Sequence, residues 1–200
     1  MQYGEYRVEY SKNPDIALLQ KNWKTLEAQQ ETTFFLSWSW ISCWLNTYQP
    51  EILLVTAYLK EAPVAMGLFT ESCEVRHKLV TSKQLLLHQT GDPQRDQIWI
   101  EYNDFICNPE HRVAASNACL NVLHQAPEWD EIVISMMREA RTEEIIVENA
   151  GFRETMNLPC FAVDLAALRK THPDFLSSLS GNTRYQVRKS SRLLAEWVSQ

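Results

Sequence analysis

The amino-acid sequence predicts an α/β protein in which a mixed β-sheet is flanked by helices. Helical segments, a run of neighbouring strands and then a β-α-β-α-β order follow one another along the chain. Of the 200 residues, 45% are hydrophobic and 22% are charged, which is typical of a globular domain with a sizeable core. The seven Trp, seven Tyr and seven Phe exclude a disordered chain, a collagen and a coiled coil.

The amino-terminal third predicts one strand and two helices. Residues 5–10 alternate in the manner of a strand. Residues 15–29 predict a helix starting at Asp15, with apolar side chains at helical spacing: Ile16, Leu19, Trp23 and Leu26. A second helix is expected after Ser37, an N-cap residue, with an inner stripe formed by Trp40, Ile41, Trp44 and Leu45. We expect this aromatic stripe to lie in the core.

The middle of the chain predicts four strands, at residues 51–59, 63–72, 83–89 and 97–106. The first two are joined by a short polar turn, and Gly91-Asp92-Pro93 separates the last two. Consecutive strands of this kind predict an antiparallel front to the sheet.

The rest of the chain alternates between helices and strands. It predicts a helix over 110–125, a strand over 130–136, a helix over 141–150 and a strand over 158–165. Gly151 is expected to end the third of these in the left-handed conformation. Two helices follow, 173–180 and 182–198, separated by Gly181, with Asn182 as the N-cap of the second.

Charge and cysteine usage limit the possible partners. The net charge of −6 disfavours nucleic acid, although residues 169–200 carry +4 and the remainder −10. The five cysteines show no CxxC pair, and the five histidines show no metal-ligand spacing, so we expect reduced, mostly buried thiols and no metal. The sequence shows no signal-peptide core and no run of about 20 apolar residues, which predicts a cytoplasmic protein without a membrane span.

Several stretches carry a resemblance to known families. The element order, DFICNPEHRVAASNACLNVL at 104–123 and IIVENAGF at 145–152 are similar to the acyl-CoA-binding part of the GNAT acyltransferase superfamily. FFLSWSWISCWL near the start and the passage over 158–194 resemble the amino-terminal half of FemAB-like and CelD (BcsL)-like acetyltransferases. The resemblance implies a GNAT-like mixed sheet, with acetyl-CoA or another acyl-CoA as co-substrate.

The resemblance also implies candidate site residues. Arg112, Ala115 and Asn117 occupy the positions of a pyrophosphate cradle, although alanine and asparagine replace its small residues. Glu101 and Asp104 stand where a carboxylate can act as a general base on the acceptor amine. The tyrosine that such enzymes often use as an acid has no counterpart in residues 141–150. Each residue also has a structural interpretation, as a surface arginine, a cap or a solvated carboxylate.

The carboxyl-terminal region carries a cationic stripe, with Arg184, Arg188 and Arg192 on one helical face. The stripe would bind an anionic substrate, or it would dock on an acidic surface or a second half of the protein. In the FemAB-like family a second GNAT-like half follows this helix. The resemblance therefore implies a GNAT-like domain over 1–170 and a basic connector over 171–200, leading to that half or to a partner subunit.

Two functions from different classes follow. The first is N- or O-acyl transfer from acyl-CoA to a small-molecule, polysaccharide or cell-envelope precursor, as in exopolysaccharide biosynthesis. The second is a non-catalytic GNAT-like half that serves as a structural or substrate-binding module.

Overall fold

The computed structural model describes residues 1–76, 78–98, 100–149, 151–159 and 161–198, and the chain forms two compact units. The first, the sheet domain, spans Met1–Thr155, and the second, the helical segment, spans Met156–Gln200. This division lies ahead of the implied boundary at residue 170, and that domain assignment stays a prediction.

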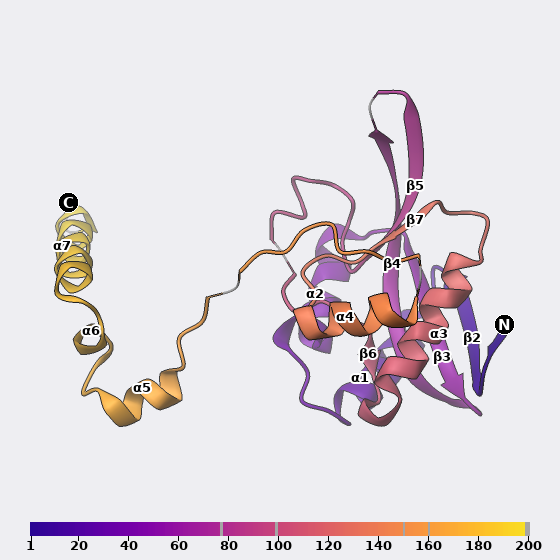
Figure 1. Ribbon diagram of the computed structural model, residues 1–200, viewed down its shortest axis with the longest axis horizontal. Coiled ribbons are helices and arrows are strands. Elements are labelled where there is room, and N and C mark those ends of the chain that lie inside the picture. The colour runs from indigo at the N-terminus through magenta and orange to yellow at the C-terminus, as the bar shows by residue number, and fades with distance from the viewer. Residues whose placement is uncertain (77, 99, 150, 160, 199–200) are drawn as a thin grey trace. The chain divides into compact units, whose positions relative to one another are not determined.

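The sheet domain is built on a mixed seven-stranded sheet (Figure 1). In spatial order the strands are β1 (Gln2–Tyr3), β2 (Tyr6–Lys12), β3 (Ile52–Leu59), β4 (Ala62–Arg76), β5 (Val80–Leu87) and β7 (Glu131–Val133). The short β6 (Ile106–Cys107) pairs with β4 beyond the carboxyl end of β5. All of these pairs are antiparallel except β5 with β7, which is parallel. The predicted class, a mixed sheet flanked by helices, is confirmed.

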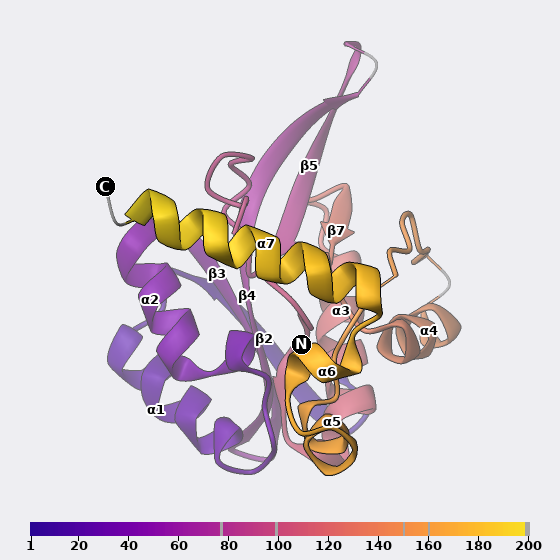
Figure 2. The ribbon, with the colours of Figure 1, turned by 90° about the vertical axis from the view of Figure 1, so that its left-hand side faces the viewer.

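Two helices cover each face of the sheet (Figures 1 and 2). On one face lie α1 (Ile16–Glu27) and α2 (Trp38–Tyr48), and on the other lie α3 (Arg112–His124) and α4 (Glu139–Glu148). The predicted caps are confirmed, since Asp15 accepts from the amides of Ala17 and Leu18, and Ser37 accepts from the amide of Trp40. These caps satisfy donors that the first turn of a helix leaves unpaired.

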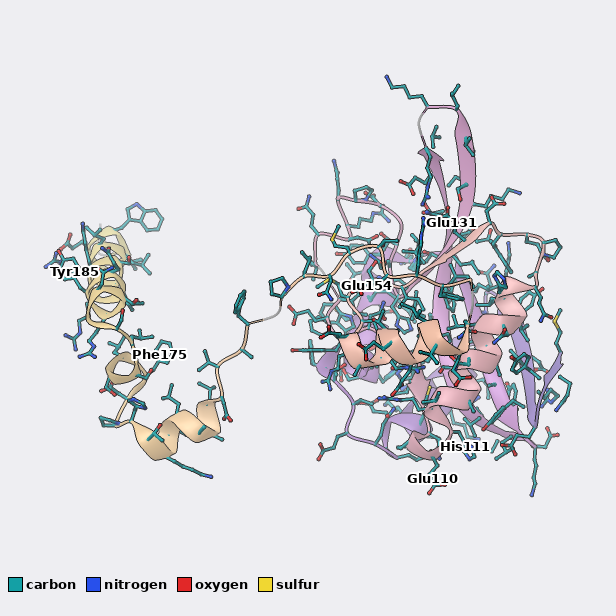
Figure 3. All side chains as sticks on the ribbon, in the orientation of Figure 1. Glu110, His111, Glu131, Glu154, Phe175 and Tyr185 are labelled. Carbon is teal, nitrogen blue, oxygen red and sulfur yellow. The ribbon has the colours of Figure 1, made fainter. Side chains whose placement is uncertain are left out.

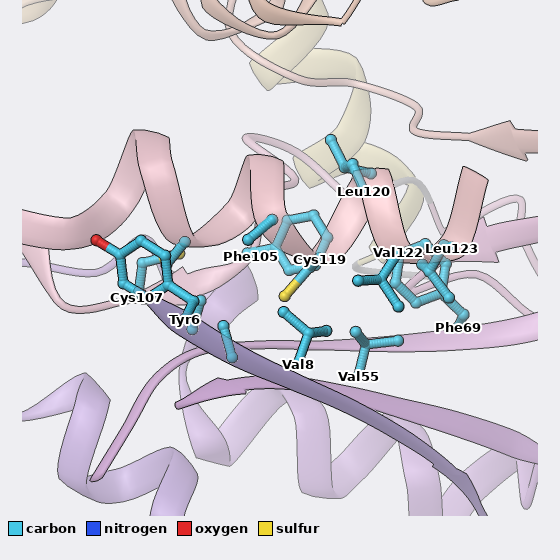
Figure 4. Close-up of a cluster of buried hydrophobic side chains, with 14 of the residues drawn as sticks. Tyr6, Val8, Val55, Phe69, Phe105, Cys107, Cys119, Leu120, Val122 and Leu123 are labelled. Atoms are coloured by element: carbon cyan, nitrogen blue, oxygen red, sulfur yellow. The ribbon is translucent and has the colours of Figure 1, made fainter. Parts of the chain in front are cut away.

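Strand alternation divides the core into two layers. Leu53 and Val55 of β3 face α3, whereas Ile52 faces α1 and α2, because successive side chains of a strand point to opposite faces. Figure 4 shows the α3 side, where Phe105 and Phe69 pack beneath Cys119 and Leu123.

The helical segment contains α5 (Leu165–Thr171), α6 (Phe175–Ser178) and α7 (Gly181–Val198). None of these helices has a buried residue, and Figure 3 shows the rings of Phe175 and Tyr185 extending from α6 and α7. Within the described part of the chain, the helices are too short or too polar to span a bilayer.

The structure corrects several predicted elements. Residues 97–106 do not form a strand: apart from β6 at their end, the described part is a loop in which Asn103 and Asp104 make side-chain hydrogen bonds. The described residues of 158–165 form no strand either, since they pair with no neighbour, and position 160 lies outside the described residues. The helix predicted over 141–150 ends at Glu148, with Asn149 as its C-cap, and the predicted left-handed stop at Gly151 follows position 150, which lies outside the described residues.

Smaller corrections concern single side chains. Ile16 is half-exposed, because only Leu19, Trp23 and Leu26 of α1 are turned into the core. Helix α7 begins at Gly181, not at Asn182, since Ser180 Oγ accepts from the amide of Thr183. Of the described cysteines, Cys107 and Cys119 are buried but Cys43 and Cys73 are exposed, so the thiols are less buried than expected.

Gly67 on β4 provides the first test of this packing. A Cβ atom at Gly67 would lie 2.8 Å from the ring of Phe105, which is 1% exposed and therefore cannot swing away. We expect Gly67→Ala to lower the free energy of unfolding by about 1–3 kcal/mol, measured by urea denaturation. Gly181→Ala is the control, since a Cβ there meets nothing within 4 Å. Equal stabilities of the two variants would contradict the close approach of Phe105.

Candidate functional site

The carboxyl ends of the parallel strands β5 and β7 are bridged by Asn103. The parallel ladder runs only from Gln84–Glu131 to Leu86–Val133. Beyond it, the Asn103 side chain donates to Leu87 O at 2.9 Å, and its backbone N–H donates to Met136 O at 3.2 Å. Asn103 is fully buried, so this bridge between the segments that follow the two strands lies inside the protein.

His88, directly after β5, holds Asn103 in place. Its Nε2 accepts from the backbone N–H of Leu68 at 3.2 Å, so the ring proton is on Nδ1, which donates to Asn103 Oδ1 at 2.9 Å. The ring of Trp23 packs edge-on against the histidine. Burial in this apolar setting lowers the pKa of His88 to about 4, against which the hydrogen bond to Asn103 acts only weakly.

Next to this bridge, a buried ion cluster joins the loop, α3 and α4. The guanidinium of Arg141, 3% exposed, lies 3.1 Å from Asp104 and 3.0 Å from Glu144. It also donates to Ser116 Oγ. Arg112 lies 3.6 Å from the same Glu144 carboxylate at the exposed edge of the cluster. The structure therefore brings together two of the predicted site residues, Asp104 and Arg112, through an arginine that the sequence did not single out.

The two carboxylates predicted as bases have different environments. Asp104 is largely buried, with 13% of its side chain exposed, and burial raises the pKa of its carboxyl although Arg141 and the Phe105 amide act in the opposite direction. Glu101 is exposed and lies outside the ion cluster. Both residues lie in a loop and not in the predicted strand.

The two small positions of the predicted cradle face the interior. Ala115 is fully buried in the core layer beneath α3. Asn117 accepts at 3.2 Å from Asn149, whose own carbonyl accepts from Asn121, so these amides tie α3 to the end of α4. Both positions therefore serve packing between elements.

The start of α3 is the most open part of this region. A 3-10 turn, η2 (Pro109–His111), leads into the helix, and Figure 3 shows Glu110 and His111 at this turn. The His111 side chain makes no cap bond; its Nδ1 lies 3.0 Å from the hydroxyl of Tyr6. The first amides of α3 therefore have no side-chain cap, although helix starts are electrostatically positive.

The remaining candidates lie elsewhere. Arg184, Arg188 and Arg192 are on α7, in the helical segment, where Arg184 donates to the carbonyls of Ser177 and Leu179. Burial raises the pKa of the Cys107 and Cys119 thiols, which makes both poor nucleophiles. The described residues contain no cluster of three potential metal ligands.

Sequence reasoning missed Asn103, His88, Arg141 and Asn149. Each makes contacts across long stretches of chain, and no spacing in the sequence marks such contacts. A local signal exists only for Arg141, which precedes Glu144 by one helical turn.

No family model and no curated protein matches the chain. Among solved structures, it is similar to a probable acetyltransferase with a TM-score of 0.48 and 13% identity, over 78% of this chain and 96% of the other. A ribosomal-protein-alanine N-acetyltransferase from Brucella melitensis biovar Abortus 2308 is similar with a TM-score of 0.47 and 10% identity, over 78% of this chain and 98% of the other. An aminoglycoside acetyltransferase from an uncultured soil metagenomic sample, in complex with trehalose, is similar with a TM-score of 0.44 and 8% identity, over 80% of this chain and 97% of the other. Likenesses this distant assign no reaction to the chain.

His88 predicts a pH dependence of stability. The folded state binds the His88 proton less readily than the unfolded state, so the free energy of unfolding should fall as the pH drops from about 6.5 to about 4. The loss attributable to His88 should approach roughly 3 kcal/mol at the low end. Urea denaturation at a series of pH values measures it, and His88→Gln should remove this part of the slope. An unchanged slope in His88→Gln would show that His88 is not a buried neutral group.

The contacts of Arg141 predict that replacing it strongly destabilises the fold, and that a second substitution at Asp104 restores part of the stability. Arg141→Met leaves the buried Asp104 carboxylate without its nearest counter-charge, and we expect a loss of about 3–5 kcal/mol in the free energy of unfolding. Adding Asp104→Asn to that variant should restore part of this loss, which a double-mutant cycle measures. Strictly additive effects would contradict the ion pair.

Proposed function

We propose that this chain acts in acyl transfer as a substrate-binding module, which binds the acceptor molecule and does not itself hold the acyl-CoA. The order of elements in the described part of the sheet domain is two strands, two helices, four strands, a helix, a strand and a helix. This order is in keeping with the GNAT resemblance and supports the link to acyl transfer. The claim that this chain does not itself hold the acyl-CoA rests on one observation, the bridge that Asn103 makes between β5 and the residues beyond β7.

The bridge lies where a thioester arm would be expected. Ligands of α/β sheets bind beyond the carboxyl ends of parallel strands, and β5 and β7 are the parallel pair of this sheet. Asn103 occupies the opening between them and bonds to Leu87, His88 and Met136. Displacing it would break three buried hydrogen bonds, each contributing about 1 kcal/mol.

The cradle residues are also unfavourable for a pyrophosphate. The guanidinium of Arg112 is paired with Glu144, and the carboxylate of Glu144 would repel the phosphates. The side chains of Ala115 and Asn117 lie in the interior, where their backbone is part of α3 and closed to a ligand. The residues of this chain therefore do not fit an acyl-CoA.

The acceptor is proposed from the sequence resemblance. We infer a polysaccharide or cell-envelope precursor, handled by a FemAB-like or CelD-like protein in the cytoplasm together with a second GNAT-like half or a partner subunit. Arg188 and Arg192 are exposed on α7 and would meet an anionic part of that precursor, whereas Arg184 already caps the end of α6.

A second candidate function has one observation in its favour. The start of α3 has no side-chain cap, and Arg112 is 43% exposed beside it, an arrangement that suits phosphate. In this alternative the chain is itself an acyl-CoA-dependent acyltransferase, with Asp104 or Glu101 as the base.

Titration with acetyl-CoA separates the two candidates. We expect millimolar acetyl-CoA to leave the melting temperature of the 200-residue chain unchanged, because a ligand that binds only the folded state must raise it. A saturable rise that Arg112→Ala abolishes and Arg188→Ala leaves intact would contradict the proposal and favour the acyltransferase. Arg188 is a matched control because it is an exposed arginine far along the sequence.

A further inference from the structure

A pocket between α2 and the loop that follows β5 is not used by the proposed function. We propose that this aromatic pocket binds an uncharged, planar six-membered ring. Its apolar walls are Trp40, Trp44 and Tyr48 from α2, and Ile98 and Ile100 from the loop. The inference depends only on this pocket, and it stands whether or not the chain acts in acyl transfer.

Helix geometry explains why the three aromatic rings meet. Positions 40, 44 and 48 recur every four residues, so their side chains lie on one face of α2. Trp44 is nearly buried, whereas Trp40 and Tyr48 are half-buried, which places the aromatic surface at the wall of an opening and not in the middle of the core. Ile98 is 62% exposed at this opening, so a large apolar surface on the loop is available to a ligand.

The part of the loop that leads into the wall, residues 90–96, is held by hydrogen bonds. The carboxylate of Asp96 accepts three hydrogen bonds of 2.8 Å, from the amide and hydroxyl of Thr90 and from the amide of Gly91. Gly91 has a φ of +77°, a conformation that suits glycine. A segment that is already held in place loses little conformational entropy when a ligand binds beside it.

The polar groups of the pocket select against charge. Asp96 is occupied by its three donors, and Arg95 lies 3.3 Å from Asp92 and donates to Tyr48 O at 3.5 Å. Both ring nitrogens of His88 are engaged in hydrogen bonds. Gln89 also lines the pocket, and its buried Oε1 is an acceptor without a hydrogen-bond partner, so the pocket has a place for one donor. A charged ligand, or a sugar ring with several hydroxyls, would lose its hydration without equivalent partners, whereas an aromatic ring with one hydroxyl loses little.

The size of the pocket indicates one ring. Its volume is about 140 Å³. That is close to the roughly 150 Å³ of an apolar cavity that holds one benzene molecule, and equals about five waters at roughly 30 Å³ each. A single six-membered ring fits, with its face against the indole surfaces.

Phenol is the probe, with binding to the whole chain measured by calorimetry and by the melting temperature. We expect saturable binding to the wild type and a rise in melting temperature. Cys43 is exposed on α2 and lines the pocket, so Cys43→Phe should fill it and weaken phenol binding by about tenfold or more. Cys73→Phe, at another exposed cysteine outside the pocket, should bind phenol as the wild type does.

Three results would overturn the proposal: no saturable phenol binding by the wild type, equal binding by Cys43→Phe, or tighter binding of benzoate or methyl glucoside than of phenol. If Cys43→Phe does not fold, Ile98→Ala replaces it, since this exposed side chain can be shortened without opening the core. We expect Ile98→Ala to weaken phenol binding by about threefold or more, and unchanged affinity would count against the pocket.

Discussion

The hydrogen bonds of one buried residue, Asn103, connect the end of β5 with the residues that follow β7, and the rest of the region is built around this connection. Its side chain joins the end of β5 through Leu87 and His88, and its backbone joins the chain beyond β7 through Met136. Without it, the short parallel ladder between β5 and β7 would have no continuation. A buried polar group that loses its hydrogen-bond partner destabilises the folded state by more than the bond itself contributes, so removing any partner of Asn103 is costly.

The ion cluster next to Asn103 extends the same constraint to the helices. Asp104 follows directly in sequence, and Arg141 connects it to Ser116 of α3 and Glu144 of α4. Two residues that resemble members of an acyltransferase site thus hold the loop to the helices. Similar residue types therefore perform a structural task here, and the aromatic pocket lies on the other side of His88, against α2.

Sequence patterns predicted most of the framework. Helices α1 and α2, their caps Asp15 and Ser37, and strands β3 and β4 depend on local periodicity and capping, which a sequence displays directly. The strand predicted over 97–106 was wrong because this loop is held by the side chains of Asn103 and Asp104, whose partners lie in distant parts of the chain. The strand over 158–165 was wrong because a strand also needs an edge to pair with, which no local pattern reveals.

The candidate site was harder to predict than the framework. Asp104 and Arg112 were found through resemblance, but what each contacts depends on Arg141 and Glu144, about 30 residues away. The aromatic stripe of α2 was expected entirely in the core. Periodicity locates a helical face but does not distinguish the part that faces the sheet from the part that faces a pocket, so Trp40 and Tyr48 could not be separated from Ile41.

Hydrogen exchange at the backbone amide of Asn103 tests the central claim most directly. We predict that this amide, which donates to Met136 O inside the protein, exchanges only through global unfolding and that acetyl-CoA leaves its protection unchanged. Exchange at the rate of a surface loop, or a loss of protection when acetyl-CoA is added, would show that the opening between β5 and β7 is not closed by Asn103.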